Sequence, residues 1–119
     1  MNNNVIRNKS YAFAIRIVNA YKFLTKEQQE YVLSKQLLRS GTAIGALVAE
    51  AEHAQSDADF LNKMNVALKE ANETVYWISL LKDTGYLQEN IYQSIVADSK
   101  ELVAILVSIV KSTRTRLSK

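Results

Sequence analysis

The chain contains one pair of residues spaced to bind a metal ion, Glu50 and His53. A glutamate three residues before a histidine places both side chains on one helix face, as in four-helix carboxylate proteins that hold two iron or manganese ions. Those sites need a second such pair and more glutamates from facing helices. His53 is the single histidine of the chain, and Glu70 and Glu73 follow more than a turn beyond the next break. We therefore predict no metal ion and no other cofactor.

No other residues are spaced for a reaction. The acidic residues have no partner acid or base at a defined spacing for proton transfer. No Ser–His–Asp arrangement and no glycine loop for phosphate is visible. Gly41 and Gly45 stand inside a helical pattern, where the backbone N–H groups are already hydrogen-bonded. We therefore predict that the protein is not an enzyme.

Positive charge is concentrated near the end of the chain. The formal net charge is +3, and the last nine residues contribute four positive charges, from Lys111, Arg114, Arg116 and Lys119. If the helices alternate in direction, Arg7 and Lys9 lie at the same end of the molecule. Such a surface holds the phosphates of RNA or DNA through charge. We predict that these six cations bind nucleic acid.

Acidic residues at the same end leave a second interpretation open. Glu50, Glu52, Asp57 and Asp59 belong to the connection between the second and third predicted helices. The basic tail is then a solvated segment that neutralises the C-terminus of the last helix. In that case the protein is a structural or protein-interaction module with a protein partner and does not bind nucleic acid.

Four helices must position these side chains. Apolar residues recur at three- and four-residue steps over roughly residues 5–24, 27–54, 57–84 and 88–115. Helices of similar length with short connections are typical of an up-down-up-down antiparallel four-helix bundle. We predict a single all-α domain over residues 1–119.

The composition also indicates a compartment. Cysteine is absent, which suits a reducing cytoplasm. The start of the chain lacks the apolar run of a signal peptide. The longest apolar run, residues 102–110, is far shorter than the roughly 20 residues that a membrane span needs. We expect a cytoplasmic protein with no membrane partner.

The second predicted helix carries small residues along one side. Gly41, Gly45 and Ala49 stand four residues apart. Glycine costs about 1 kcal/mol relative to alanine inside a helix. Its use here indicates that another helix approaches closely, with ligand binding as the alternative.

Three patterns mark the ends of the predicted helices. Thr25 with Gln28, and Ser56 with Asp59, fit the capping box. The first pair predicts a tight turn before the second helix. Gly85 is placed to terminate the third helix.

Polar residues on the second and third predicted helices have a structural interpretation. Arg39 with Glu70 or Glu73 is predicted to form an ion pair, within or between subunits, that fixes register more than it adds stability. We interpret Trp77 as an anchor in the core or in an interface, and not as a platform for stacking bases.

The first and last helices predict self-association. Residues 102–110 are apolar on nearly every side, whereas a surface helix normally has a polar face. The first helix adds Val5, Ala14 and Val18 outside its main apolar stripe. Large exposed apolar patches are rare on soluble monomers, so we predict burial against other copies of the chain. The alternative is a bundle whose twist buries this surface alone.

Residues 36–81 carry a resemblance. The segments are QLLRSGTAIGA from residue 36, VAEA from 48, ADF from 58 with Lys63, ALKEA from 67, and the pairs ET at 73 and YW at 76. In them the chain resembles the 23S rRNA intervening-sequence proteins, a family of small bacterial four-helix bundles. Leu47 stands where that family usually has asparagine, and the turn after the first helix lacks the proline common in relatives. The polar contact of that asparagine is therefore missing here.

The resemblance implies a homopentameric ring of four-helix protomers with no known catalytic activity. Relatives include the accessory variability proteins of diversity-generating retroelements, which are basic pentamers that bind nucleic acid and a reverse transcriptase. The resemblance therefore implies a binding protein for structured RNA or DNA, as accessory to a nucleic-acid enzyme. In a closed ring the basic tails would repeat around one face and reinforce each other.

Overall fold

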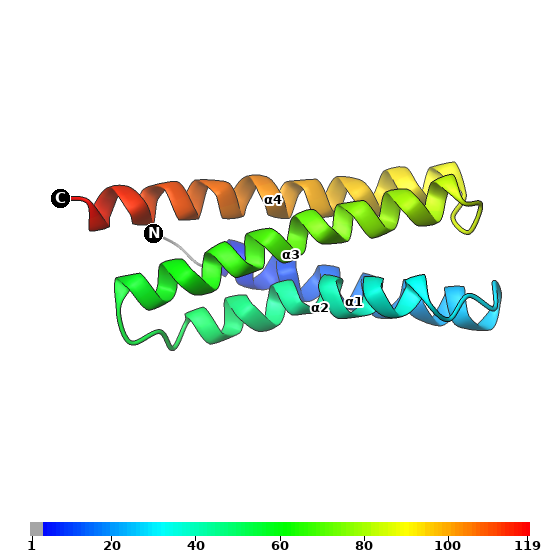
Figure 1. Cartoon of the computed structure of the whole chain (residues 1–119), viewed down its shortest axis with the longest axis horizontal. Helices are drawn as coiled ribbons and strands as arrows, with labels where there is room; N and C mark the ends of the chain where they lie inside the picture. Colours follow the sequence, from blue (N-terminus) through cyan, green and yellow to red (C-terminus); the bar gives the residue numbers. More distant parts are fainter. Residues whose placement is uncertain (1–3) are drawn as a thin grey trace.

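The structure, a computed structural model, describes residues 4–119, and this part of the chain forms four helices and no strand. The helices are α1 (Asn4–Lys26), α2 (Leu33–Ala51), α3 (Asp57–Asp83) and α4 (Glu89–Leu117). They lie lengthwise in a molecule of 51 × 21 × 20 Å, and each loop lies at one of its two ends (Figure 1). The predicted all-α class is confirmed.

The connection between α1 and α2 is longer than predicted. The second helix begins at Leu33, six residues later than residue 27, where the sequence placed its start. Thr25 does not cap it, because its hydroxyl donates to the carbonyl of Tyr21 inside α1 at 2.9 Å. The predicted tight turn is therefore wrong. The other helix ends differ from the expected ranges by at most three residues.

Glu30 caps α2 in place of the predicted threonine. Its Oε2 accepts hydrogen bonds from the backbone N–H groups of Val32 at 3.1 Å and Leu33 at 2.9 Å, and its Oε1 accepts from Ser34 at 2.7 Å. Burial would raise the pKa of the Glu30 carboxyl, but these bonds to its charged form outweigh burial and lower the pKa. The helix therefore starts without a capping side chain at position 32.

Both ends of α3 follow the predicted signals. Ser56 Oγ accepts from the Asp59 N–H at 3.1 Å, and the Asp59 carboxylate accepts from the N–H of the residue before Ser56 at 3.3 Å. At the other end, Gly85 has φ +90°, in the left-handed region that glycine adopts readily. The Tyr86 N–H then reaches the Leu81 carbonyl at 2.9 Å, as in a Schellman motif.

The helices α1 and α2 approach closely at the two glycines. A Cβ on Gly41 would lie 2.7 Å from Cγ1 of Ile17, and a Cβ on Gly45 would lie 3.3 Å from the carbonyl oxygen of Ser10. Ile17 and Ser10 are both buried. The glycines thus face α1, which is the close approach that their spacing predicted, and they line none of the pockets described below.

The core is formed by one apolar stripe from each helix. Its largest buried side chains include Phe13, Ile17, Leu37, Ile44, Met64, Ile78, Leu102 and Leu106. Within the apolar run of α4, Leu102, Leu106, Ile109 and Val110 are buried, and the side chains between them are half-buried or exposed. The bundle alone therefore covers more of α4 than the sequence predicted, and half of the exposed large apolar side chains lie on α1.

Candidate nucleic-acid interface

Three segments meet at one end of the molecule, here called the charged end: the start of α1, the α2–α3 loop and the last turns of α4 (Figure 1). Arg7 Nη1 of α1 lies 3.3 Å from Glu52 Oε1 of the loop. Arg116 of α4 donates from Nε to Asp57 Oδ2 at 3.1 Å and from Nη2 to Oδ1 at 3.3 Å. The acidic loop therefore lies between cations from the two ends of the chain.

The six predicted cations divide into two groups. Arg7 and Arg116 are ion-paired as above, and Lys9 Nζ lies 3.2 Å from Glu101 Oε2 of α4. Lys111, Arg114 and Lys119, here called the unpaired cations, are exposed and have no acidic oxygen within 4.0 Å among residues 4–119. Exposed ion pairs contribute only about 0–1 kcal/mol, so the paired cations can also exchange a carboxylate for a phosphate.

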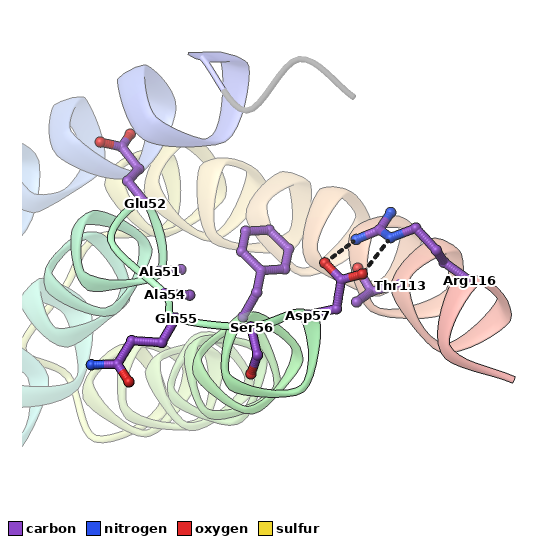
Figure 2. A pocket seen from close by; sticks show the side chains of 9 residues that line it. Ala51, Glu52, Ala54, Gln55, Ser56, Asp57, Thr113 and Arg116 are labelled. Carbon is purple, nitrogen blue, oxygen red and sulfur yellow. Dashed lines mark hydrogen bonds and ion pairs between the residues drawn. The ribbon is translucent and has the colours of Figure 1, made fainter.

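A pocket of about 420 Å³ opens between the α2–α3 loop and α4. It is lined by Ala51, Glu52, Ala54, Gln55, Ser56, Asp57, Phe60, Thr113 and Arg116. In Figure 2, Asp57 and Arg116 point toward one another, whereas Gln55 points away from them. No sequence pattern predicted this pocket. Phe60, one turn beyond the Ser56 cap, stands in the sequence only as part of the segment ADF that carries the family resemblance.

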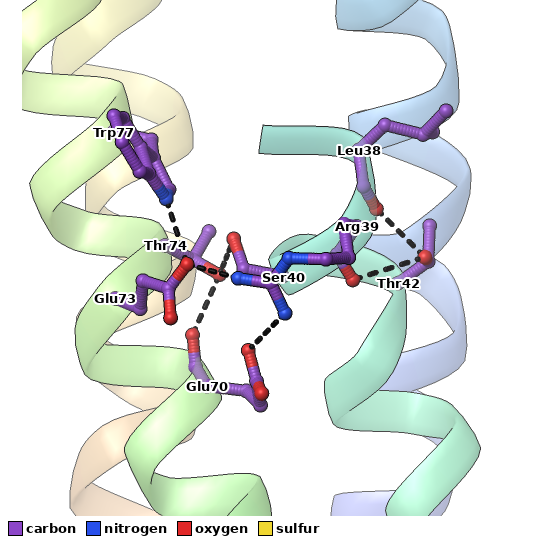
Figure 3. Close-up of polar contacts among 8 residues, drawn as sticks. All are labelled: Leu38, Arg39, Ser40, Thr42, Glu70, Glu73, Thr74 and Trp77. Atoms are coloured by element: carbon purple, nitrogen blue, oxygen red, sulfur yellow. Dashed lines mark hydrogen bonds and ion pairs between the residues drawn. The ribbon is translucent and has the colours of Figure 1, made fainter. Parts of the chain in front are cut away.

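A polar cluster joins the middle of α2 to α3 (Figure 3). Arg39 Nη1 lies 3.1 Å from Glu70 Oε1, and Arg39 Nη2 bonds to Glu73 Oε2. Beneath them, the buried Thr74 Oγ1 lies 2.9 Å from Ser40 Oγ and 2.8 Å from the Glu70 carbonyl oxygen. The arginine therefore contacts both carboxylates that the sequence offered as alternatives.

Trp77 belongs to the same cluster. Its Nε1–H donates to Glu73 Oε2 at 2.9 Å, one turn away on α3. This bond, together with the Arg39 guanidinium and against partial burial, lowers the pKa of Glu73. The indole is partly buried against the core, and its ring meets that of Tyr76 edge-on at 5.0 Å. A role for this cluster between subunits stays a prediction.

An exposed apolar stripe runs along α1. Tyr11 is 69% exposed, Ile15 50% and Val18 37%, at spacings that place them on one helix face. The sequence predictions include Val18 but not Tyr11 or Ile15, although the four-residue spacing of Tyr11 and Ile15 was the available signal. Phe23 of α1 and Ile91 of α4 line a second apolar surface, a groove of about 290 Å³ between these helices.

Glu50 and His53, the pair spaced to bind a metal ion, lie at the end of α2 and in the loop that follows. Lys63 Nζ lies 3.7 Å from Glu50 Oε1, and His53 is exposed. Within residues 4–119, no group of three or more histidine, aspartate and glutamate side chains is placed to hold a metal ion. In the same part of the chain, every helix is too short or too polar to cross a membrane.

Fold and site together define a small all-α protein with a charged end that combines ion pairs and unpaired cations. The model of the 23S rRNA-intervening sequence protein family matches residues 2–108, so the chain belongs to that family. This confirms the resemblance found in the sequence. A protein with unknown function from the S23 ribosomal protein family of Bacteroides thetaiotaomicron has a similar crystal structure, with a TM-score of 0.91. The two share 59% identity over 93% of this chain and 99% of that one. No curated protein matches the chain.

Proposed function

We propose that the protein is a non-enzymatic homo-oligomer of up-down-up-down bundles that binds structured RNA or DNA through its charged end. The observation that carries this proposal is the group of unpaired cations: Lys111 and Arg114 lie on the last turns of α4, and Lys119 lies just beyond its end at Leu117. Cations without acidic neighbours are available to phosphates at no cost in lost ion pairs.

The exposed stripe on α1 supports self-association. Tyr11, Ile15 and Val18 are large side chains on one face of the first helix, and burial against another copy would remove them from water. We propose a closed ring, with five subunits as the family resemblance implies. Each copy would then add its unpaired cations to a common face, where their fields sum.

Sedimentation analysis tests the assembly. We expect a mass several times 13.4 kDa at micromolar concentration, and an Ile15→Glu variant that dissociates because it would bury an unpaired charge. A single-chain mass for the unmodified protein at that concentration would refute the oligomer.

A fluorescence anisotropy titration with a labelled structured RNA tests the ligand. The test variant changes Lys111, Arg114 and Lys119 to glutamine. The matched control changes the same number of exposed cations at the other end of the molecule, Lys22, Lys26 and Lys35. Measurements at about 50 and about 200 mM salt separate phosphate contacts from other binding.

The proposal expects a specific pattern. The unmodified protein and the control bind with affinity that falls steeply with salt, whereas the test variant binds at least about 10-fold more weakly. Its salt slope falls by about one for each lost phosphate contact. Equal loss in both variants would mean that net charge alone attracts RNA, and absence of binding at about 50 mM salt would refute nucleic-acid binding.

A structural or protein-interaction module is the second candidate. It is favoured by the acidic partners already held by Arg7, Lys9 and Arg116, which reduce the free positive charge of this end. The apolar groove beside Phe23 and Ile91 offers a surface for a helix of a protein partner. Such binding would respond little to salt, so the same titrations distinguish the two functions.

A further inference from the structure

The pocket at the charged end joins an aromatic side chain to charged groups. Phe60 lines it from α3, with Ala51 and Ala54 from the end of α2 and the following loop. The Arg116–Asp57 ion pair closes one side, and Glu52, which is held by Arg7, lies on another. The pocket, of about 420 Å³, therefore offers the ring of Phe60 for apolar contact, and its charged lining consists of Arg116 and the carboxylates of Glu52 and Asp57.

This combination matches an unpaired nucleotide better than a duplex. Proteins that hold single strands stack bases on aromatic rings and hold the backbone with cations. A duplex offers only its phosphates and groove edges, because its bases are stacked on one another. The volume falls in the range of sites that enclose small molecules, so the pocket has room for one base.

The rim can supply phosphate contacts at low cost. The side chains of Arg7 and Arg116 are 48% and 50% exposed, so each ion pair contributes little and can open. Asp57 keeps a favourable position without Arg116, because it lies in the first turn of α3, where the helix dipole favours negative charge. Lys119 follows Arg116 by three residues, just beyond the end of α4 at Leu117, and its side chain is exposed.

We propose that this pocket receives one unpaired base of a bound strand, stacked on Phe60, while Arg116 and Lys119 hold the adjoining phosphates. The inference rests on the proposed nucleic-acid binding and deepens it, because it makes single strands or unpaired loops the preferred ligand. The charged end alone would not discriminate, since charge attracts single strands and duplexes alike.

The test compares two probes on three variants. The probes are a single-stranded oligoadenylate of about 12 nucleotides, within the length that one binding domain covers, and an RNA duplex of equal length. Phe60→Leu keeps the apolar contact and removes the ring face, and Phe60→Tyr keeps the ring. The control, Phe23→Leu, makes the same substitution at an exposed phenylalanine near the C-terminus of α1, away from the charged end.

We expect Phe60→Leu to weaken single-strand binding about 5- to 100-fold, the range found when a stacking side chain is removed, and to leave duplex binding unchanged. Phe60→Tyr and Phe23→Leu should keep the affinity for the single strand. Thermal unfolding by circular dichroism verifies that each variant is folded.

Three results would overturn the inference. In the first, the unmodified protein binds the duplex as tightly as the single strand, and both affinities are unchanged in Phe60→Leu. That result would support nucleic-acid binding by the charged end and refute base binding in the pocket. If Phe60→Leu instead alters the sedimenting mass, a protein segment from another copy occupies the pocket. If neither probe binds at about 50 mM salt, the proposed function fails together with this inference.

Discussion

Replacing Gly41 with alanine tests the close approach of α1 and α2. The added Cβ would lie 2.7, 2.9 and 3.0 Å from Cγ1, Cγ2 and Cδ1 of Ile17, whereas carbon atoms in favourable contact are about 3.5–4.0 Å apart. All three atoms belong to the side chain of Ile17, which is fully buried and branched at Cβ. A change of rotamer does not relieve the contact, because it moves one branch away and brings the other branch into its place. The helices must therefore separate or Ile17 must be strained.

Two effects oppose each other in this variant. Alanine favours the helical state by about 1 kcal/mol over glycine. Overpacking of a well-packed core costs about 1–3 kcal/mol. We therefore expect Gly41→Ala to lower the free energy of unfolding by about 1 kcal/mol, or to lower Tm by roughly 4 °C at this chain length. Urea unfolding at one fixed protein concentration measures the difference.

A double-mutant cycle with Ile17 separates the two effects. Ile17→Ala removes all three crowded atoms, so Gly41→Ala should stabilise that background by about 1 kcal/mol through helix propensity alone. The effect of Gly41→Ala on the free energy of unfolding should thus be negative with isoleucine at position 17 and positive with alanine there. If Gly41→Ala stabilises the unmodified protein as much as the Ile17→Ala variant, the crowding does not exist and the glycine has another role.

Two further predictions concern the carboxyl groups with lowered pKa. Glu30→Gln should lower the free energy of unfolding by about 1–2 kcal/mol at pH 7. Because the pKa of Glu30 is lower in the folded state, its contribution is complete above about pH 4.3 and is lost as the pH falls below that value. The free energy of unfolding, measured with urea at pH 7 and at pH 3, should therefore change less between the two pH values in the variant than in the unmodified protein. The fluorescence of Trp77, the single tryptophan, should titrate with Glu73 below about pH 4.3, and Arg39→Gln should raise that midpoint. An unchanged midpoint would show that Arg39 does not stabilise the charged carboxylate.

Local signals predicted the ends of α3, because each depends on a few neighbouring residues. Ser56 caps the helix three residues before Asp59, and Gly85 supplies the positive φ that ends it. The start of α2 depends on a different geometry. Gln29 has φ 55°, in a region that non-glycine residues seldom adopt, just before Glu30 turns its carboxylate onto the N–H groups of α2. The capping-box pattern does not describe a glutamate in this position, so the sequence pointed to Thr25 instead.

The charged end shows why composition overstates the positive charge available to a ligand. Each residue of an α-helix is rotated by about 100° from the one before, so Arg114 and Arg116 point in directions about 160° apart. Arg116 meets Asp57, whereas Arg114 has no acidic partner within residues 4–119. Which cations are paired thus depends on how α4 is rotated against the α2–α3 loop, and the sequence contains that rotation only through packing. Hence we expect Lys111, Arg114 and Lys119 to contribute to the salt dependence of binding. Arg116 should contribute only where a bound strand displaces the Asp57 carboxylate from it.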